Sequence, residues 1–445
     1  MTNISEVIED LVIPDFQANQ IVVQETARLM QGTGFPLFAN VETAEKKRIK
    51  DLSHTALISL IVEYTAQQLV VEGVSDTEGD QPQIFEPFVR NGLPSRQLAL
   101  HSSVLTNGAA FGLAIPGDLR AGGDPSHAFI GAFGMERMGA IYSDTVLDEF
   151  PEWAYLRGNR AGTDTFMLWD NEFQYEAVND GSGWQLTSDP LFHGMGKTPV
   201  VKLTNNEDLN GVATGEPMKY RQDVQRMGKT VDDRLRIQHY NSWRVKYAIK
   251  LSDHLTEEEE KKVRLKLEQE DILLGFEDTE FGTLDQTDLG PMIAAQETDR
   301  DTLAAVSQTP VWAFNGGSMV NLSADALIEA KSGNRQKVGA VQRSLNRPYC
   351  NWFRLAALAE NRLADAQNFG LVPTWLDMGS LSLSAAADGL GKLAVSLGVP
   401  VEELWEYIPN VPLAKVQAWR EKLSVGNADL GALVEARRGT NSPGV

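Results

Sequence analysis

The chain has 445 residues, of which 42% are hydrophobic and 23% are charged. This length and composition are typical of a globular protein with a sizeable core and two or three domains, and they exclude wholesale disorder. Its 40 Lys and Arg against 61 Asp and Glu give 40 − 61 = −21, which excludes a protein that coats nucleic acid or an anionic membrane through a broad basic surface. The single cysteine, Cys350, excludes an intrachain disulfide and a zinc site built on thiolates.

The start of the chain carries no sign of a targeting segment. Residues 1–20 are acidic and lack the basic and apolar regions of a signal peptide. The longest apolar runs, such as Ala56–Val62, are far shorter than the ~20 residues that span a bilayer. We therefore expect a soluble protein made in a reducing cytoplasm, with no membrane partner.

The N-terminal half is predicted to contain helices followed by strands. Apolar residues have helical spacing in 1–74 and in 85–107, and the polar, breaker-rich segment 75–82 between them is predicted to be a loop. From 109 to 203, short apolar or alternating runs are interrupted by Gly, Asp and Pro, which predicts an antiparallel meander. This part of the chain is expected to be a mixed α/β region.

From Gly215 onward the apolar spacing is helical again. A helix over 216–240 has one apolar stripe, formed by Tyr220, Val224, Met227, Val231 and Leu235. At ~100° per residue, its basic residues lie roughly opposite that stripe, namely Lys219, Arg226, Lys229 and Arg236. Strands are predicted at 243–251 and 272–276, with a capped helix from Thr256 between them, and a second long helix is predicted at 289–308.

The C-terminal third is predicted to be helical after an apolar loop at 311–323. Gly316 and Gly317 permit backbone angles that other residues avoid, so this loop can turn tightly or move. Ser323 is a suitable N-cap for a long helix to about Ala366, which Pro348 should kink. The predicted buried face of this helix is Val338, Val341, Leu345, Trp352, Leu355 and Ala359, with Arg343, Arg347 and Arg354 roughly opposite. Short helices are predicted after residue 372.

The sequence predicts no catalytic residue, no metal ligands and no cofactor. The six histidines are scattered without metal-ligand spacing. Gly196-Lys197-Thr198 imitates the end of a phosphate-binding loop, but Leu191 occupies the position of its first glycine and Pro199 follows where a helix should begin. Cys350 is expected to be an inert thiol, and the acidic segment 397–423 fits helix packing better than a DNA-reading helix-turn-helix.

Charge is unevenly distributed along the chain. Residues 216–250 hold nine basic and four acidic residues, a local +5. Residues 251–300 hold five basic and fifteen acidic residues, a local −10, and residues 331–362 hold seven basic and one acidic residue, a local +6. Two basic helical faces therefore flank an acidic insert. Solvated helix faces would produce this pattern, and so would a surface that meets a polyanion without gripping it, because tight gripping needs dense Lys and Arg.

Four groups of short segments, in order along nearly the whole chain, resemble those of tailed-bacteriophage portal proteins (head-to-tail connectors) from phages of actinobacteria and other Gram-positive hosts. The first group is Phe88–His101 with Leu105–Gly108, and the second is His193–Val201 with Gly215–Pro217. The third is Ser307–Pro310 with Met319–Leu327, and the fourth is Ala385–Asp388 with Gly398–Trp405. The Gly316-Gly317 pair is a departure from what the resemblance leads us to expect.

The resemblance implies an α+β portal fold and a ring, usually of twelve subunits, at one capsid vertex of the virion, assembled in the host cytoplasm. Double-stranded DNA would pass through the ring during packaging and ejection. The implied regions are a wing (1–215 and the long kinked helix 324–371), stem helices (216–240 and 288–309), a small α/β clip (241–287), a tunnel loop (310–323) and a helical crown with the C-terminal tail (372–445). The implied partners are the terminase large subunit, the head-tail adaptor, the major capsid protein and the scaffolding protein.

Three sets of residues are candidates for these contacts. In the tunnel loop, Asn315, Gly316, Gly317, Ser318, Met319 and Val320 would face DNA. The basic candidates of the channel are Lys219, Arg226, Lys229, Arg236, Lys331, Arg335 and Lys337, which would touch phosphates transiently or form ion pairs between subunits. Glu257, Glu258, Glu259 and Glu260 of the clip would dock the motor or adaptor, or form a solvated face. The alternative functions are a packaging ATPase of the terminase kind and a monomeric capsid adaptor without a channel.

Overall fold

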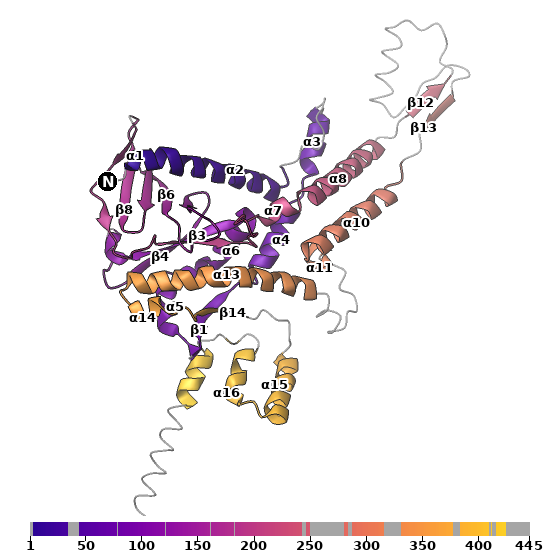
Figure 1. Ribbon diagram of the computed structural model, residues 1–445. Helices are drawn as coiled ribbons and strands as arrows, with labels where there is room; N and C mark the ends of the chain where they lie inside the picture. The colour runs from indigo at the N-terminus through magenta and orange to yellow at the C-terminus, as the bar shows by residue number, and fades with distance from the viewer. Residues whose placement is uncertain are drawn as a thin grey trace, which may run out of the picture.

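Figure 1 shows the fold of the chain in a computed structural model. The structure describes residues 3–33, 44–77, 79–120, 122–160, 162–181, 183–242, 246–249, 280–283, 287–315, 331–376, 383–408, 411 and 415–423. These residues form a mixed helix and strand body, a pair of long helices that projects from it, and a group of short C-terminal helices on another side (Figure 1). The fold is α+β, as the sequence predicts.

A three-stranded sheet packed on the longest helix forms the centre of the body. The antiparallel strands β11 (Val200–Thr204), β3 (Ala109–Pro116) and β4 (Ala128–Gly134) lie in that order. Helix α13 (Ser332–Ala359) lies against this sheet. The Trp352 side chain packs on β3 at Gly112, where a Cβ atom would be 2.5 Å from the indole ring. The Trp352 indole N–H donates to the Leu113 carbonyl oxygen at 3.1 Å. The other core helices are α4 (Leu57–Ala66), α5 (Pro82–Arg90) and α6 (Gln97–Asn107).

A second antiparallel sheet confirms the meander predicted for 109–203. Its strand order is β10-β8-β7-β6-β5, and β9 pairs with β8. The N-terminal helical segment, which consists of α1 (Ile4–Val7), the π-helical turn η1 (Ile8–Val12) and α2 (Ile13–Met30), covers its apolar face. The strands are β5 (Met138–Ile141), β6 (Trp153–Arg160), β7 (Thr163–Trp169), β8 (Phe173–Asn179), β9 (Trp184–Leu186) and β10 (Leu191–Phe192).

A third sheet corrects two predictions. Strand β1 (Val71–Asp76) pairs with β2 (Gly79–Asp80) on one side and with β14 (Val372–Trp375) on the other. The helical prediction for residues up to 74 and the loop prediction for 75–82 were therefore wrong at this strand, and helical structure begins after β14 rather than at 372. These strands are short and their pairing joins distant parts of the chain, so local spacing does not reveal them.

The projecting part of the molecule begins at α7 (Glu216–Lys219) and α8 (Arg221–Ser242), and returns through α10 (Gly290–Ser307). Beyond these helices, β12 (Lys246–Ile249) pairs with β13 (Glu280–Thr283). The predicted return strand at 272–276 lies outside the described residues. The one-turn helix α11 (Val311–Asn315) follows α10, which corrects the loop prediction for 311–315. Helix α3 (Ala44–Leu52) packs beside α8.

Helix α13 confirms the predicted buried face and corrects one arginine. It continues through Pro348 and ends at Ala359, and the short helix α14 (Leu363–Ala366) follows. All six apolar residues of the predicted face are buried. Arg354 is also buried, contrary to the prediction, because its guanidinium bonds the Ala366 carbonyl and Glu149. The C-terminal helices are α15 (Leu383–Leu397), α16 (Val401–Leu404), the 3-10 turn η4 (Trp405–Tyr407) and the last described turns at 415–423.

Candidate functional site

Helices α8 and α10, which we call the stem, pack against each other through the apolar stripe predicted from sequence. Tyr220, Val224, Met227 and Val231 are buried, and α10 contributes Leu303 and Ala304. Leu235, the last residue of the stripe, is half-buried against the same core. The opposite side of α8 is exposed or half-buried, and this is where the basic residues lie.

Three basic residues of α8 that the sequence singles out are paired with acidic residues of the same chain. Arg226 contacts Asp299 of α10 at 3.0 Å and Asp223 at 3.3 Å. Lys229 pairs with Asp233, and Arg236 contacts the buried Asp232 at 2.9 Å. Thr230 also donates to Asp299 at 2.6 Å, so one carboxylate accepts hydrogen bonds from two successive turns of α8. These ion pairs neutralise Arg226, Lys229 and Arg236 within one subunit.

A buried ion-pair cluster joins α13 to the start of α7 and to the end of α10, where the stem meets the body. Glu216 is 1% exposed, and its carboxylate contacts Lys337 of α13 at 2.7 Å and Lys219 at 2.9 Å. The Tyr220 hydroxyl donates to the same carboxylate at 2.7 Å. Lys337 is 7% exposed and also donates to the carbonyl oxygen of Ser307, the last residue of α10. One ammonium group therefore connects the start of α7, the end of α10 and the long helix.

The electrostatics of this cluster favour an ionised carboxylate. Burial acts to raise the pKa of Glu216, but the charges of Lys337 and Lys219 outweigh it and lower that pKa to about 2. Burial is also the main effect on Lys337, where it lowers the pKa against the opposing attraction of Glu216. In this arrangement Lys337 is buried in an ion pair within its own chain rather than exposed to a phosphate.

The other residues predicted to contact DNA or partner proteins are the remaining basic candidates, the tunnel loop and the clip glutamates. Lys331 lies over the Trp312 ring at 5.6 Å, and Arg335 is exposed with no ion pair among the described residues. Asn315 ends α11. Gly316, Gly317, Ser318, Met319 and Val320 of the predicted tunnel loop lie outside the described residues, and so do Glu257, Glu258, Glu259 and Glu260 of the predicted clip. The structure brings Lys219 and Lys337 together, whereas Arg226, Lys229, Arg236 and Lys331 each contact a separate partner.

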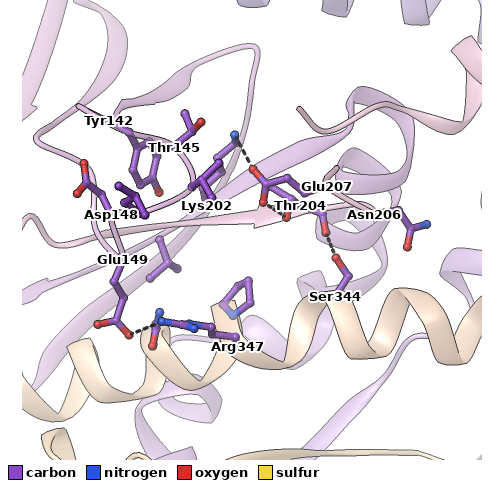
Figure 2. Close-up of a pocket in the computed structure, with 15 residues that line it drawn as sticks. Tyr142, Thr145, Asp148, Glu149, Lys202, Thr204, Asn206, Glu207, Ser344 and Arg347 are labelled. Carbon is purple, nitrogen blue, oxygen red and sulfur yellow. Dashed lines mark hydrogen bonds and ion pairs between the residues drawn. The ribbon is translucent and has the colours of Figure 1, made fainter. Parts of the chain in front are cut away.

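Two loops beside α13 form a pocket that the sequence did not predict. It has a volume of about 440 Å³ and is lined by the loop Tyr142–Glu149, by β11 and the loop after it, and by one face of α13. Figure 2 shows Glu149 pointing toward Arg347 of α13, and Glu207 between Lys202 and Thr204. Charge and exposed apolar residues are mixed here without a repeating period, so no sequence pattern marks the pocket.

The comparison with protein families decides the identity of this arrangement. The family model described as "Phage portal protein, SPP1 Gp6-like" matches residues 18–425, which is most of the chain. The chain belongs to this phage portal family. No curated protein matches it. The portal family is a family of structural components of the virion rather than of enzymes.

The residues that imitate enzyme motifs have environments that differ from those of a phosphate-binding loop or a catalytic thiol. Thr198 is followed by strand β11 rather than by a helix, and the Lys197 ammonium lies over the Phe150 ring at 4.7 Å. The Cys350 thiol donates to the Leu371 carbonyl oxygen, and burial raises its pKa to about 11, so it is a poor nucleophile. Within the part of the portal that the structure describes, no three metal-binding side chains gather, and no helix is long and apolar enough to cross a membrane.

Proposed function

We propose that this portal protein forms a ring-shaped channel at one capsid vertex, through which double-stranded DNA is packaged and later ejected. In this proposal the ring has about twelve copies, as the family resemblance implies. Its clip docks the terminase large subunit and then the head-tail adaptor, while its wing contacts the major capsid protein and the scaffolding protein. It is not an enzyme.

The stem is the observation that supports a conduit most directly. It projects from the body (Figure 1), and three basic residues of α8 are paired with acidic residues of the same subunit. Affinity for DNA rises with the number of phosphates that free cations neutralise. A wall whose cations already have acidic partners would contact DNA weakly and let it slide.

Exposed acidic residues of α10 also support a channel through which DNA slides. Glu297 and Asp301 are one turn apart and exposed, and neither has an ion-pair partner among the described residues. Carboxylates in this position would repel phosphates. We propose that α8 and α10 line the channel, that the tunnel loop at 310–323 approaches the DNA, and that Glu257–Glu260 contribute to docking at the clip.

Imaging of the purified full-length protein tests the proposal. We expect ring-shaped particles with a central opening wide enough for a DNA duplex, and a particle mass close to twelve times the 48.9 kDa of the subunit. A protein that remains a compact monomer would favour the capsid-adaptor alternative. ATP hydrolysis by the purified protein would instead favour the packaging ATPase, although the segment around Gly196 lacks the geometry of a phosphate loop.

A further inference from the structure

Two neighbouring turns hold exposed leucines at their tips beside the pocket of Figure 2. Leu147 is 81% exposed in the turn 144–148, and Leu209 is 95% exposed in the turn 208–212. Val146 and Val212 beside them are also more than half exposed. Exposed apolar side chains gathered in one place are typical of interaction surfaces rather than of free surface. We call these four residues, Val146, Leu147, Leu209 and Val212, the leucine knobs.

Each turn is internally braced, so its leucine is presented in a fixed position. The Asp144 carboxylate accepts hydrogen bonds from the backbone N–H groups of Val146 and Leu147 at 2.8 and 3.1 Å. The Asp208 carboxylate accepts them from Asn210 and Val212, both at 2.9 Å. Side-chain caps of this kind mimic a backbone turn and hold it closed. A braced turn loses little conformational entropy when it binds.

The two turns also contact each other. Gly211 has φ +77°, and a Cβ atom there would lie 2.3 Å from the Thr145 hydroxyl, so only glycine lets the second turn approach the first this closely. The knobs therefore form one surface together with the pocket. Acidic residues predominate in and around it, since the five residues Asp144, Asp148, Glu149, Glu207 and Asp208 outnumber Lys202, Arg347 and the buried Arg354 that contacts Glu149.

Helix α3, on a different part of the chain, carries basic and apolar side chains that complement this acidic and apolar surface. Lys47 and Arg48 are exposed, and neither they nor Lys50 form an ion pair with any described residue. Leu52 at the end of the helix is 74% exposed. The nine residues 44–52 hold four basic and two acidic residues, a local +2 in a chain with a net charge of −21. Helix α3 is thus an exposed cationic segment that ends in an apolar side chain.

We infer that a second copy of this chain docks its α3 on the leucine knobs and the acidic pocket beside them. Lys47 or Arg48 of the second copy would enter the pocket and meet Asp148, Glu149 and Glu207, while Leu52 would pack on the knobs. The inference rests on the proposed function, because a contact between two different patches is head-to-tail and closes into a ring when the rotation permits. Opposite charges across the contact would also select the correct partner face.

Chemical cross-linking of full-length protein tests this contact. In the variant with Arg48→Cys and Leu147→Cys, a short bifunctional maleimide should yield a ladder of covalent multimers beyond the dimer, because every subunit contributes one cysteine to each neighbour. The native Cys350 gives little background, since burial raises the pKa of its thiol. The matched control pairs Arg48→Cys with Leu191→Cys, an exposed leucine of β10, and should stay monomeric on a denaturing gel. Dimers alone would indicate a symmetric contact and overturn the proposal.

Charge reversal provides a second, independent measurement. K47E with R48E, and separately L147K with L209K, should each raise the protein concentration needed for half-maximal assembly at least tenfold, whereas L191K should leave it unchanged. Rings that form normally in both variants would overturn the α3 contact but leave the ring itself intact. Normal rings that no longer enter capsids would show that the knobs bind another capsid component instead. Wild-type protein that never forms rings would overturn the proposed function and this contact together.

Discussion

The body and the stem are stabilised by different physical means. In the body, α13 presents large aromatic side chains to the central sheet, and Trp352, Tyr349 and Phe353 are almost entirely buried. In the stem, a single apolar stripe joins α8 to α10, and the exposed side is covered by ion pairs such as Arg226 with Asp299. Close packing makes the body rigid. On the surface of the stem, ion pairs neutralise charge and contribute little packing.

The largest loss of stability is expected in the body. Trp352→Ala removes the indole that fills the space above Gly112 and its hydrogen bond to Leu113, and should lower the free energy of unfolding by about 3–5 kcal/mol. Denaturant titration measures the loss. Trp352→Phe, which retains an aromatic ring, should lose less. Equal stability of Trp352→Ala and wild type would mean that the body is not held by this packing.

The junction between body and stem should be nearly as sensitive. Lys337→Met leaves the buried Glu216 carboxylate with Lys219 as its remaining cation, and should cost about 3 kcal/mol of unfolding free energy. The double variant Lys337→Met/Glu216→Gln removes the uncompensated charge and should recover most of the loss. If the single and double variants unfold together, the ion pair does not hold the stem to α13.

A pH dependence should arise in the body from His101, which is fully buried and contacts the Tyr349 hydroxyl at 2.8 Å. Burial lowers the pKa of its imidazole to about 4, from an ordinary value of 6.5. The unfolded chain therefore takes up the proton first, so stability is complete above pH 6.5 and falls as the pH drops toward 4, by at most about 3 kcal/mol. Unfolding measured across this range in His101→Gln should lack this slope, and an identical slope in both proteins would assign it to other groups.

The smallest effect on stability is expected on the exposed side of the stem. Arg226→Gln breaks contacts with Asp299 and Asp223 near the surface, where an ion pair contributes at most about 1 kcal/mol. Thermal unfolding at low and high salt should show a small loss that shrinks as salt screens the charges. A loss as large as that of Trp352→Ala would mean that the stem depends on its ion pairs for folding.

The sequence predicts the parts of this fold that have a local period. The stripe of Tyr220, Val224 and Val231 identifies α8 and its buried side, because a helix repeats every 3.6 residues. The pairing of β1 with β14 has no such signal, since it joins two short segments about 300 residues apart. The distribution of charge along the sequence also indicates a basic stem. It does not show that Asp299 of α10 neutralises Arg226 of α8, because the two residues are far apart in the sequence. The pocket was missed for the same reason, because three distant segments build it.

The speed of DNA ejection tests the central claim most directly, namely that neutralised stem cations let DNA slide. Asp233→Asn and Asp299→Asn each remove one carboxylate from the ion pairs of Lys229 and Arg226, so these two cations of α8 are less completely neutralised. Asp164→Asn, which frees Arg157 on the outer sheet, is the matched control. We predict that particles with both stem substitutions eject DNA more slowly than wild type, with the difference largest at low salt, while the control is unchanged. Equal ejection rates for all three kinds of particle would contradict the account.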